Sequence, residues 1–295
     1  MSNYSHNLQQ MNTSCDPTSI QETADSLVII RADVNLAKPL GVDDPFAHLF
    51  VTEAGKRMAS MAISVDPCYV DFNLVRYRHI TERIRGAISR YHQILFLGAG
   101  YDTRAISMPE FGDNPVDIFE VDYPDKLTSK RRILMQAGVQ LPSYFRFVPM
   151  NLSQSGLLQH LCSVGFRPSE PTLVIMEGLL FFLPSETAER LIHPATLNLA
   201  PGSTVIFDYW SNERINMLNL QVEEKLGKRL FSLFPYPDHP AQFHNCLSDM
   251  GYQDIVISDL NMLVSEIHQG FRNNDQPDQW FVVQTVYKSN YGKVR

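Results

Sequence analysis

Two glycines that follow a short apolar run mark a place where the backbone could meet a ligand. Gly98 and Gly100 stand in the stretch "ILFLGAGYDTR". A strand that ends in Gly-x-Gly turns tightly and leaves bare backbone at the turn, because no side chain blocks the approach. The dinucleotide fingerprint Gly-x-Gly-x-x-Gly would need a third glycine at position 103, where the chain has Thr103. The pair therefore indicates either a nucleotide-type site or an ordinary glycine turn.

Polar residues stand at the ends of the three apolar runs that come next. Asp122 ends "DIFEVD", Asn151 and Leu152 follow "FRFVPM", and Glu177 follows "TLVIM". An acid about 20 residues beyond a glycine turn is placed to accept hydrogen bonds from ribose hydroxyls, although a strand-end aspartate is also common without any function. Glutamate is rarely buried without a partner, so Glu177 is predicted to be functional.

S-adenosylmethionine suits this set of groups better than a dinucleotide does. A pyrophosphate is bound by exposed backbone N–H groups, a helix N-terminus and often a third glycine, and only the first two are predicted here. S-adenosylmethionine has a ribose and an adenine but no phosphate, and it carries an ammonium, a carboxylate and a sulfonium. A glycine turn, a ribose-binding acid and a distant arginine for the carboxylate would match those groups.

The elements that position these residues are predicted from short apolar runs, which are separated by spacers of helix length. Such alternation predicts an α/β fold with an open, mainly parallel sheet and right-handed crossovers, whose strands bind ligands at their carboxyl ends. The last two runs are joined by a polar connector, residues 261–279, with room for only a short helix, so the final strand is predicted to enter antiparallel. The predicted strands are "QILFLGAG", "VDIFEVDYP", "FRFVPMNL", "TLVIMEG", "TVIFDYW", "DIVISDL" and "QWFVVQTVYK".

A single domain is predicted from residue 19 to residue 295, since the chain has no internal repeat and no low-complexity linker. Residues 19–91 are predicted to form a helical cap, and residues 92–295 the α/β core. An insertion around 209–245 is rich in aromatic residues and would either cover a pocket or pack on the sheet edge. Residues 1–18 are polar and are expected to be a disordered or frayed tail.

The cap ends in an amphipathic helix within "DFNLVRYRHITERIRGAISRYHQ". Its apolar stripe runs from Tyr77 to Tyr91 at helical spacing. Arg76, Arg83 and Arg90 lie off this stripe, so by default they face solvent.

The composition excludes several classes of partner. The net charge of −7 argues against nucleic acid or an anionic membrane, because proteins that bind phosphates usually carry a basic excess. The four cysteines are scattered, so neither a metal site nor a disulfide framework is predicted, as expected for a reducing, cytoplasmic setting. The first residues lack the apolar region of a secretory signal, and the longest apolar run, 173–183, is too short to span a membrane.

The sequence resembles the leucine carboxyl methyltransferase family of S-adenosylmethionine-dependent methyltransferases, including bacterial members whose activity is assigned only provisionally. The resemblance runs from about residue 23 to residue 208. It implies a Rossmann-like, class I methyltransferase sheet. The motifs that carry it are "ETADSLVIIRAD", "DDPFAHLF", "VRYRHITERI", "LGAGYDTRAI", "IFEVDYPD" and "LVIMEGLLFFLPSE".

The resemblance also implies a cofactor site. Arg76 would bind the methionine carboxylate, Asp122 the ribose, and Glu177 would face the amino-acid end of the cofactor. Where family members commonly have Asp-Leu beside the adenine, this chain has Asn-Leu, which keeps an acceptor oxygen and loses a charge. The implied cofactor-binding residues are Arg76, Gly98, Ala99, Gly100, Asp122, Asn151, Leu152, Glu177 and, from the cap, Arg31.

The function that follows is O-methylation of a carboxylate or hydroxyl group, on a small metabolite or on a peptide C-terminus. A carboxylate needs no general base, whereas a hydroxyl does, and no catalytic residue is assigned among the candidates His79, His193, His239 and His244. The alternatives are a nicotinamide-dependent oxidoreductase and a non-catalytic scaffold with the same fold. The sequence leaves the oligomeric state open.

Overall fold

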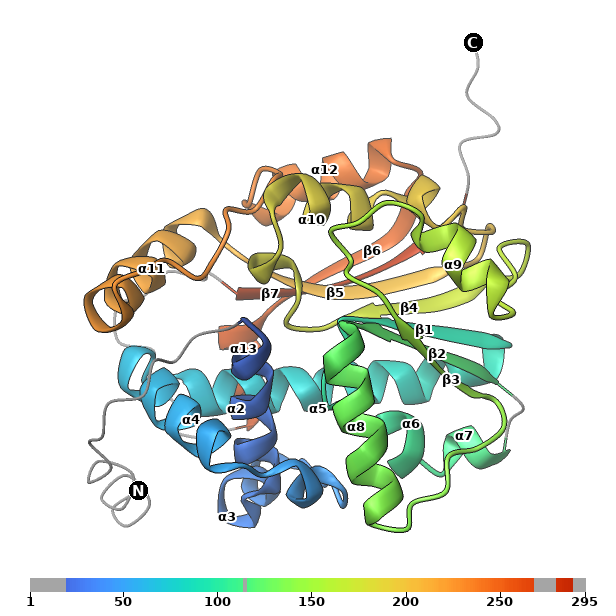
Figure 1. Cartoon of the computed structure of the whole chain (residues 1–295). Coiled ribbons are helices and arrows are strands. Elements are labelled where there is room, and N and C mark those ends of the chain that lie inside the picture. The colour runs from blue at the N-terminus through green and yellow to red at the C-terminus, as the bar shows by residue number, and fades with distance from the viewer. Residues whose placement is uncertain (1–19, 114–115, 268–279, 289–295) are drawn as a thin grey trace.

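One seven-stranded sheet forms the centre of the protein (Figure 1). The computed structural model describes residues 20–113, 116–267 and 280–288, so the tail predicted at 1–18 lies outside the described residues. The strand order is β3-β2-β1-β4-β5-β7-β6. The strands are β1 (Gln93–Leu97), β2 (Asp117–Asp122), β3 (Phe145–Pro149), β4 (Thr172–Met176), β5 (Thr204–Trp210), β6 (Tyr252–Asp259) and β7 (Trp280–Tyr287).

The sheet is parallel except at β7, which is inserted antiparallel between β5 and β6. All seven predicted strands and the antiparallel entry of the last one are confirmed. Every residue of β1 and β4 is buried, because helices cover both faces of the sheet at its centre. The chain leaves β1 toward β2 on one side and later returns to form β4 on the other, which makes the end of β1 the switch point where such sheets bind ligands.

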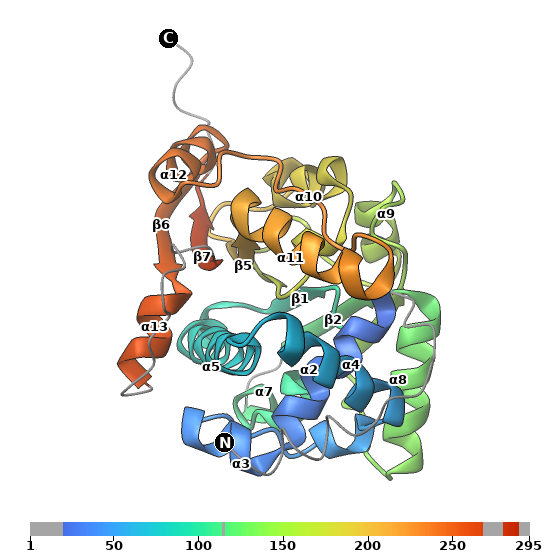
Figure 2. The same cartoon turned by 90° about the vertical axis from the view of Figure 1, so that its left-hand side faces the viewer.

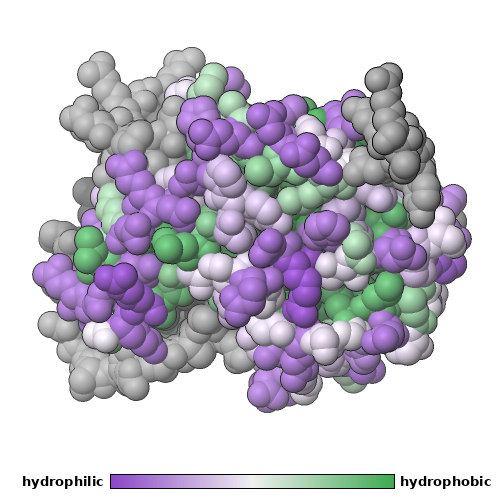
Figure 3. Space-filling view, turned by 90° about the horizontal axis from the view of Figure 1, so that it is seen from above, coloured by the Kyte–Doolittle hydropathy of each residue, from purple (hydrophilic) through white to green (hydrophobic). Residues whose placement is uncertain are grey.

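Helices lie on both faces of the sheet (Figure 1). Helices α9, α10 and α12 cover one face, and α5, α6 and α8 cover the other. Hydrophilic side chains dominate the outer surface of the layer that contains α9, α10 and α12, and hydrophobic side chains form separate groups on it (Figure 3). The helices of the core are α6 (Arg104–Ser107), α7 (Glu110–Asp113), α8 (Pro124–Gln136), α9 (Leu157–Ser163), α10 (Ser185–Ile192), α11 (Asn212–Leu226), α12 (Pro240–Asp249) and α13 (Leu260–Ile267), with the 3₁₀ helices η4 (Leu180–Phe182) and η5 (Pro194–Thr196).

The N-terminal region is helical, as predicted, and its helices pack beside α5 (Figure 2). Thr52 begins α4 by accepting a hydrogen bond from the backbone N–H of Gly55, and Gly41 ends η1 with a φ of 73° that favours glycine. The elements are α2 (Ile20–Ala32), α3 (Val34–Ala37), η1 (Lys38–Leu40), η2 (Ala47–Phe50), α4 (Glu53–Val65), α5 (Tyr69–Ala87) and η3 (Ile88–Arg90).

The predicted stripe of α5 is buried from Tyr77 to Tyr91, but the default placement of Arg76 was wrong. Arg90 is exposed and Arg83 is half-buried, whereas only 1% of Arg76 is exposed. A second side of the helix is also covered. There the side chain of Arg76 reaches the carboxylates at the ends of β4 and β5.

Candidate functional site

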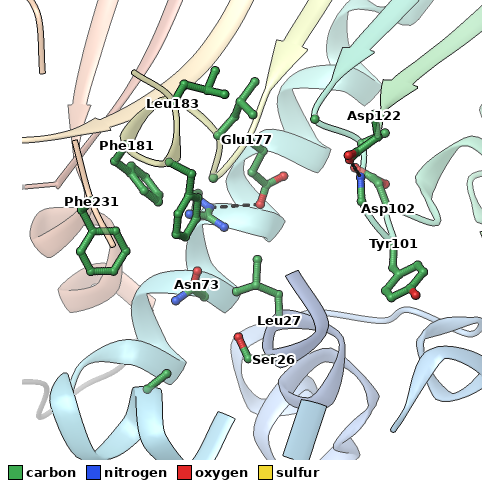
Figure 4. A pocket seen from close by; sticks show the side chains of 18 of the residues that line it. Ser26, Leu27, Asn73, Tyr101, Asp102, Asp122, Glu177, Phe181, Leu183 and Phe231 are labelled. Atoms are coloured by element: carbon green, nitrogen blue, oxygen red, sulfur yellow. Dashed lines mark hydrogen bonds and ion pairs between the residues drawn. The ribbon is translucent and has the colours of Figure 1, made fainter. Parts of the chain in front are cut away.

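A pocket lies between the N-terminal helices and the carboxyl ends of the central strands (Figure 4). Helices α2, α4 and α5 contribute one wall, and the turns after β1, β2 and β4 contribute the opposite wall. Eight of the nine residues predicted to bind a cofactor line it: Arg31, Arg76, Gly98, Ala99, Gly100, Asp122, Leu152 and Glu177. The ninth, Asn151, is not part of the lining, and its Oδ1 accepts a hydrogen bond from the backbone N–H of Ser153 at 2.9 Å.

The glycine turn favours glycine at positions 98 and 100, and position 98 has little room for a side chain. Gly98 has a φ of 68° and Gly100 a φ of 48°, both in the left-handed region. A Cβ atom at position 98 would lie 2.5 Å from Cδ1 of Leu179, which is well inside contact distance. The backbone N–H groups of Gly98 and Ala99 both donate to the carbonyl of Val121, so the turn is fixed against β2.

Asp122 stands at the end of β2 beside this turn. Its carboxylate accepts hydrogen bonds at 2.6 Å from the backbone N–H groups of Gly100 and Tyr123. Burial raises the pKa of Asp122, and the two N–H groups oppose that shift. Each carboxylate oxygen has two lone pairs, so the group can accept further hydrogen bonds from a ligand.

Two arginines hold Glu177 between them. Arg76 donates from Nε to Oε1 of Glu177 at 3.1 Å and from Nη1 to Oδ2 of Asp208 at 3.1 Å. Arg104 donates from Nη2 to the other oxygen of Glu177 and also pairs with Asp102 at 2.9 Å. The result is a buried, alternating row of charges along the pocket wall.

Aromatic rings fix the two guanidinium groups in place. Arg76 lies over the ring of Trp280 at 5.0 Å, and Arg104 lies over the ring of Tyr77 at 4.4 Å. The indole N–H of Trp280 donates to Asp208 at 2.9 Å. Each arginine therefore has both a carboxylate partner and a stacking partner, which leaves little freedom in the position of Glu177.

The arginines also determine the ionisation of Glu177. Burial by itself would raise its pKa, but Arg104 and Arg76 outweigh burial and hold the pKa of Glu177 below its usual value. Glu177 is consequently an anion at neutral pH. It can receive a cationic group of a ligand at the pocket wall.

Thr103, at the position of the missing third glycine, joins the turn to the N-terminal helices. Its hydroxyl donates to Oδ1 of Asp44 at 2.6 Å. Arg31 donates to the other oxygen of Asp44 at 2.9 Å and to the backbone carbonyl of Tyr101 at 2.8 Å. A glycine at 103 could not form this link, so the departure from the dinucleotide fingerprint has a structural reason.

Sequence reasoning missed four residues of the site. Asp102 and Arg104 follow the glycine turn directly in "GAGYDTR", which is the signal that could have found them. Asp208 lies in the last part of β5, near the edge that carries Asp122 and Glu177, so the strand-end rule applied to the fifth strand would have included it. Trp280 begins the antiparallel strand β7, and nothing in the sequence indicates that this strand starts at the pocket.

The candidate histidines do not take part in the pocket wall. None of His79, His193, His239 and His244 is among the residues that line it. Within the described ranges, no three His, Cys, Asp or Glu side chains gather as a metal ion would need. No helix in the same ranges has both the length and the apolar character that crossing a bilayer requires.

Comparisons with known proteins find relatives that match the part of the chain that carries most of this pocket. The family model "Leucine carboxyl methyltransferase" matches residues 28–196, more than half of the chain. A provisionally assigned S-adenosyl-L-methionine-dependent methyltransferase from Mycolicibacterium smegmatis is 31% identical over 227 residues, 72% of each chain. A similar protein from Mycobacterium avium is 30% identical over 235 residues, 73% of this chain and 74% of its own.

Solved structures agree with the fold. A provisionally assigned methyltransferase from Thermobifida fusca superposes with a TM-score of 0.61 at 16% identity, covering 92% of this chain and 95% of its own. A protein of family DUF574 from Streptomyces avermitilis superposes with a TM-score of 0.57 at 13% identity, covering 85% and 95%. At such identities the likeness concerns the fold alone. The sequence matches show that this chain belongs to the leucine carboxyl methyltransferase family.

Proposed function

We propose that this protein transfers a methyl group from S-adenosyl-L-methionine to an oxygen atom, carboxylate or hydroxyl, of a small-molecule acceptor. The observation that carries the proposal is the pocket itself, which has a polar wall and an apolar wall. Polar groups at the ends of β1, β2 and β4 match the cofactor, and apolar side chains from α4 and α11 leave space for an acceptor. Membership of a methyltransferase family sets aside the nicotinamide-dependent oxidoreductase.

The residues present fit the cofactor. The glycine turn lines the pocket and would lie against the methionine part, with both glycines in the left-handed region. Asp122 has lone pairs for the ribose hydroxyls, and ionised Glu177 suits the ammonium group. Leu152 and Met150 offer an apolar border for the adenine.

Two arginines are available for the carboxylate of the methionine part. Arg76 uses Nε and Nη1 for Glu177 and Asp208, and among the hydrogen bonds described none involves its Nη2, which lies close to Gly178. Arg31 lines the same pocket from α2. A guanidinium that is already fixed by other contacts binds a carboxylate at a low cost in side-chain entropy.

Positioning accounts for the catalysis that this chain would provide. S-adenosyl-L-methionine, when bound, supplies a methyl group on a sulfonium, which an oxygen nucleophile displaces in line. The fixed row of Arg76, Glu177 and Arg104 would orient the donor, and the helices of the cap would exclude water from it. Proximity and orientation of this kind need no acid or base on the protein when the acceptor is a carboxylate.

The cap and the core would act as one catalytic unit, residues 19–295. Side chains from α2, α4 and α5 line the same pocket as the turns of the sheet. The link from Thr103 to Asp44 ties the two parts together at the glycine turn. Neither part alone would enclose the cofactor.

S-adenosylhomocysteine, the product of methyl transfer, is expected to raise the thermal midpoint. A ligand that binds only the folded state at 100 times its Kd adds about 2.7 kcal/mol of stability. For a chain of this size that corresponds to roughly 5 °C. Differential scanning fluorimetry with S-adenosylhomocysteine, and with NADP as the matched control, measures the shift. A shift with NADP and none with S-adenosylhomocysteine would refute the proposal, and no shift with either would favour a scaffold.

A further inference from the structure

We propose that the acceptor is an uncharged aromatic small molecule that carries a hydroxyl group. This inference rests on the methyl transfer proposed above. It concerns the apolar part of the pocket, here called the aromatic chamber, which lies beyond Glu177 from the glycine turn (Figure 4). The side chains that define the aromatic chamber are Met58, Met61, Phe181, Phe182, Leu218 and Phe231.

Aromatic rings form a continuous wall in the chamber. The centroids of Phe181 and Phe182 are 4.9 Å apart, and those of Phe182 and Phe231 are 5.4 Å apart. On its other side Phe181 stacks on Trp210, with centroids 3.7 Å apart and ring planes 7° apart. Ring walls of this kind favour a flat aromatic ligand, which can stack on one ring and meet the edge of another.

No lysine or arginine is among the described side chains that define the chamber, which argues against a free carboxylate. Arg214 pairs with Asp66 and lies over the rings of Trp210 and Trp280. Arg76, on the polar side, pairs with two carboxylates, and its Nη2 is the group proposed above for the carboxylate of the cofactor. A carboxylate acceptor would lose its hydration beside Asp66 and Glu177 without gaining a partner of its own, and burying an unpaired charge is costly.

Asn73 provides a neutral polar group inside the chamber. Its side chain lies in the space between Phe231 and Leu27 (Figure 4). Its Nδ2 donates to the carbonyl of Tyr69 at 2.7 Å, which directs Oδ1 to act as the acceptor. A hydroxyl group can donate to Oδ1, whereas an ionised carboxylate has no proton to donate.

The walls also limit the size of the acceptor. Helix α11 packs on α4 across the chamber, and two side-chain contacts join them (Figure 2). Lys225 donates to Ser64 at 2.6 Å, and Arg214 pairs with Asp66. Walls joined in this way suit a small molecule better than a peptide chain.

The methyl transfer to a hydroxyl group is balanced when a water molecule accepts the hydroxyl proton. The hydroxyl oxygen forms a bond to the methyl carbon while the bond from that carbon to sulfur breaks, and the sulfonium becomes the thioether of S-adenosylhomocysteine. A water molecule that enters the chamber with the acceptor takes the hydroxyl proton and so serves as the general base, since no histidine lines the pocket among the described residues. Asn73 and the ring wall would position the hydroxyl group for this step.

Tryptophan fluorescence tests the inference directly. The chain has two tryptophans, Trp210 and Trp280, and both line the pocket, so a ligand bound in the pocket should quench their fluorescence. The full-length protein is titrated at pH 7, in the presence of S-adenosylhomocysteine, with 4-bromophenol and 6-bromo-2-naphthol. The matched carboxylates are 4-bromobenzoate and 6-bromo-2-naphthoate. At least one hydroxyl compound is expected to bind tenfold or more tightly than its carboxylate partner.

Variants distinguish the chamber from non-specific binding. Phe231→Ala should weaken the tighter hydroxyl compound at least fivefold and leave the Kd of S-adenosylhomocysteine within twofold. Leu233→Ala, two residues further along and 49% exposed, is the matched control and should change neither. Equal or tighter binding of the carboxylates, or no binding of any of the four compounds while S-adenosylhomocysteine still binds, would overturn the inference. Failure of S-adenosylhomocysteine to bind would instead overturn the proposed function.

Discussion

Arg76→Ala is expected to lower the free energy of unfolding by about 3–5 kcal/mol, because it leaves the buried carboxylate of Asp208 without its ion-pair partner and removes one of the two arginines that hold Glu177. Arg76 is 1% exposed and pairs with Glu177 and Asp208. Helical periodicity alone, which puts this residue on a solvated face, predicts almost no loss. The same change should weaken binding of S-adenosylhomocysteine by roughly 1.5–3 kcal/mol, the range for hydrogen bonds to charged groups. Denaturation in guanidinium chloride and calorimetric titration measure the two effects.

Two further variants make the test of Arg76 specific. Arg76→Lys should recover only part of both effects, because an ammonium cannot reproduce the forked contacts to two carboxylates. Arg83→Ala changes an arginine seven residues later on the same helix, where its Nε contacts only His79, at 3.4 Å, among the hydrogen bonds described. If Arg76→Ala and Arg83→Ala were equally stable, the buried row of charges would not be as described.

Lys130→Met is expected to destabilise the fold by a similar amount, about 3–5 kcal/mol, because it removes one partner of a buried ion pair. Lys130 on α8 donates at 2.5 Å to Glu120 on β2, and both side chains are 1% exposed. Its Nζ also donates to the backbone carbonyl of Asp102 in the glycine turn. The variant should therefore lose affinity for S-adenosylhomocysteine as well as stability.

The loss in Lys130→Met should grow with pH. Burial raises the pKa of Glu120 to about 7 even beside Lys130, and removing Lys130 raises it further. Up to about pH 7 the buried carboxyl keeps its proton in both folded proteins, so both lose stability alike as the pH rises from 4.5 to 7. Above pH 7 the wild-type carboxyl ionises beside Lys130 while that of the variant stays protonated, so the difference between the two proteins grows as the pH rises from 7 to 9. Urea denaturation across that range measures this. Arg131→Met, an exposed neighbour on the same helix, is the control, and recovery in the double variant with Glu120→Gln would support the pair. A loss that does not change with pH would contradict it.

Much of the fold could be predicted because its signals are local. Each strand is an apolar run of the length that a buried strand needs, and the polar residues that end β2 and β4 follow from the chain itself. Asp122 and Glu177 lie beside the glycine turn for that reason. The position of β7 between β5 and β6 could not be predicted from local signals, because it depends on pairing with β5 through residues far apart in sequence.

The charge network could not be predicted, because its partners come together only in the folded chain. Arg76 and Asp208 are 132 positions apart, and periodicity describes only one buried side of α5. For Asn151 a local interaction, and not a distant one, explains the difference. The residue stands at a strand end as expected, yet its side chain accepts a hydrogen bond from the backbone N–H of Ser153 and so does not point into the pocket. The strand-end rule does not take such local hydrogen bonds into account.

We expect this pocket to bind S-adenosyl-L-methionine in one orientation, and a crystal structure of the complex with S-adenosylhomocysteine would reveal that orientation. The ribose hydroxyls should lie within hydrogen-bonding distance of Asp122, the ammonium group beside Glu177, and the sulfur atom should face the aromatic chamber. A ligand bound elsewhere on the protein, or one in this pocket with its ribose away from Asp122, would refute the proposed site.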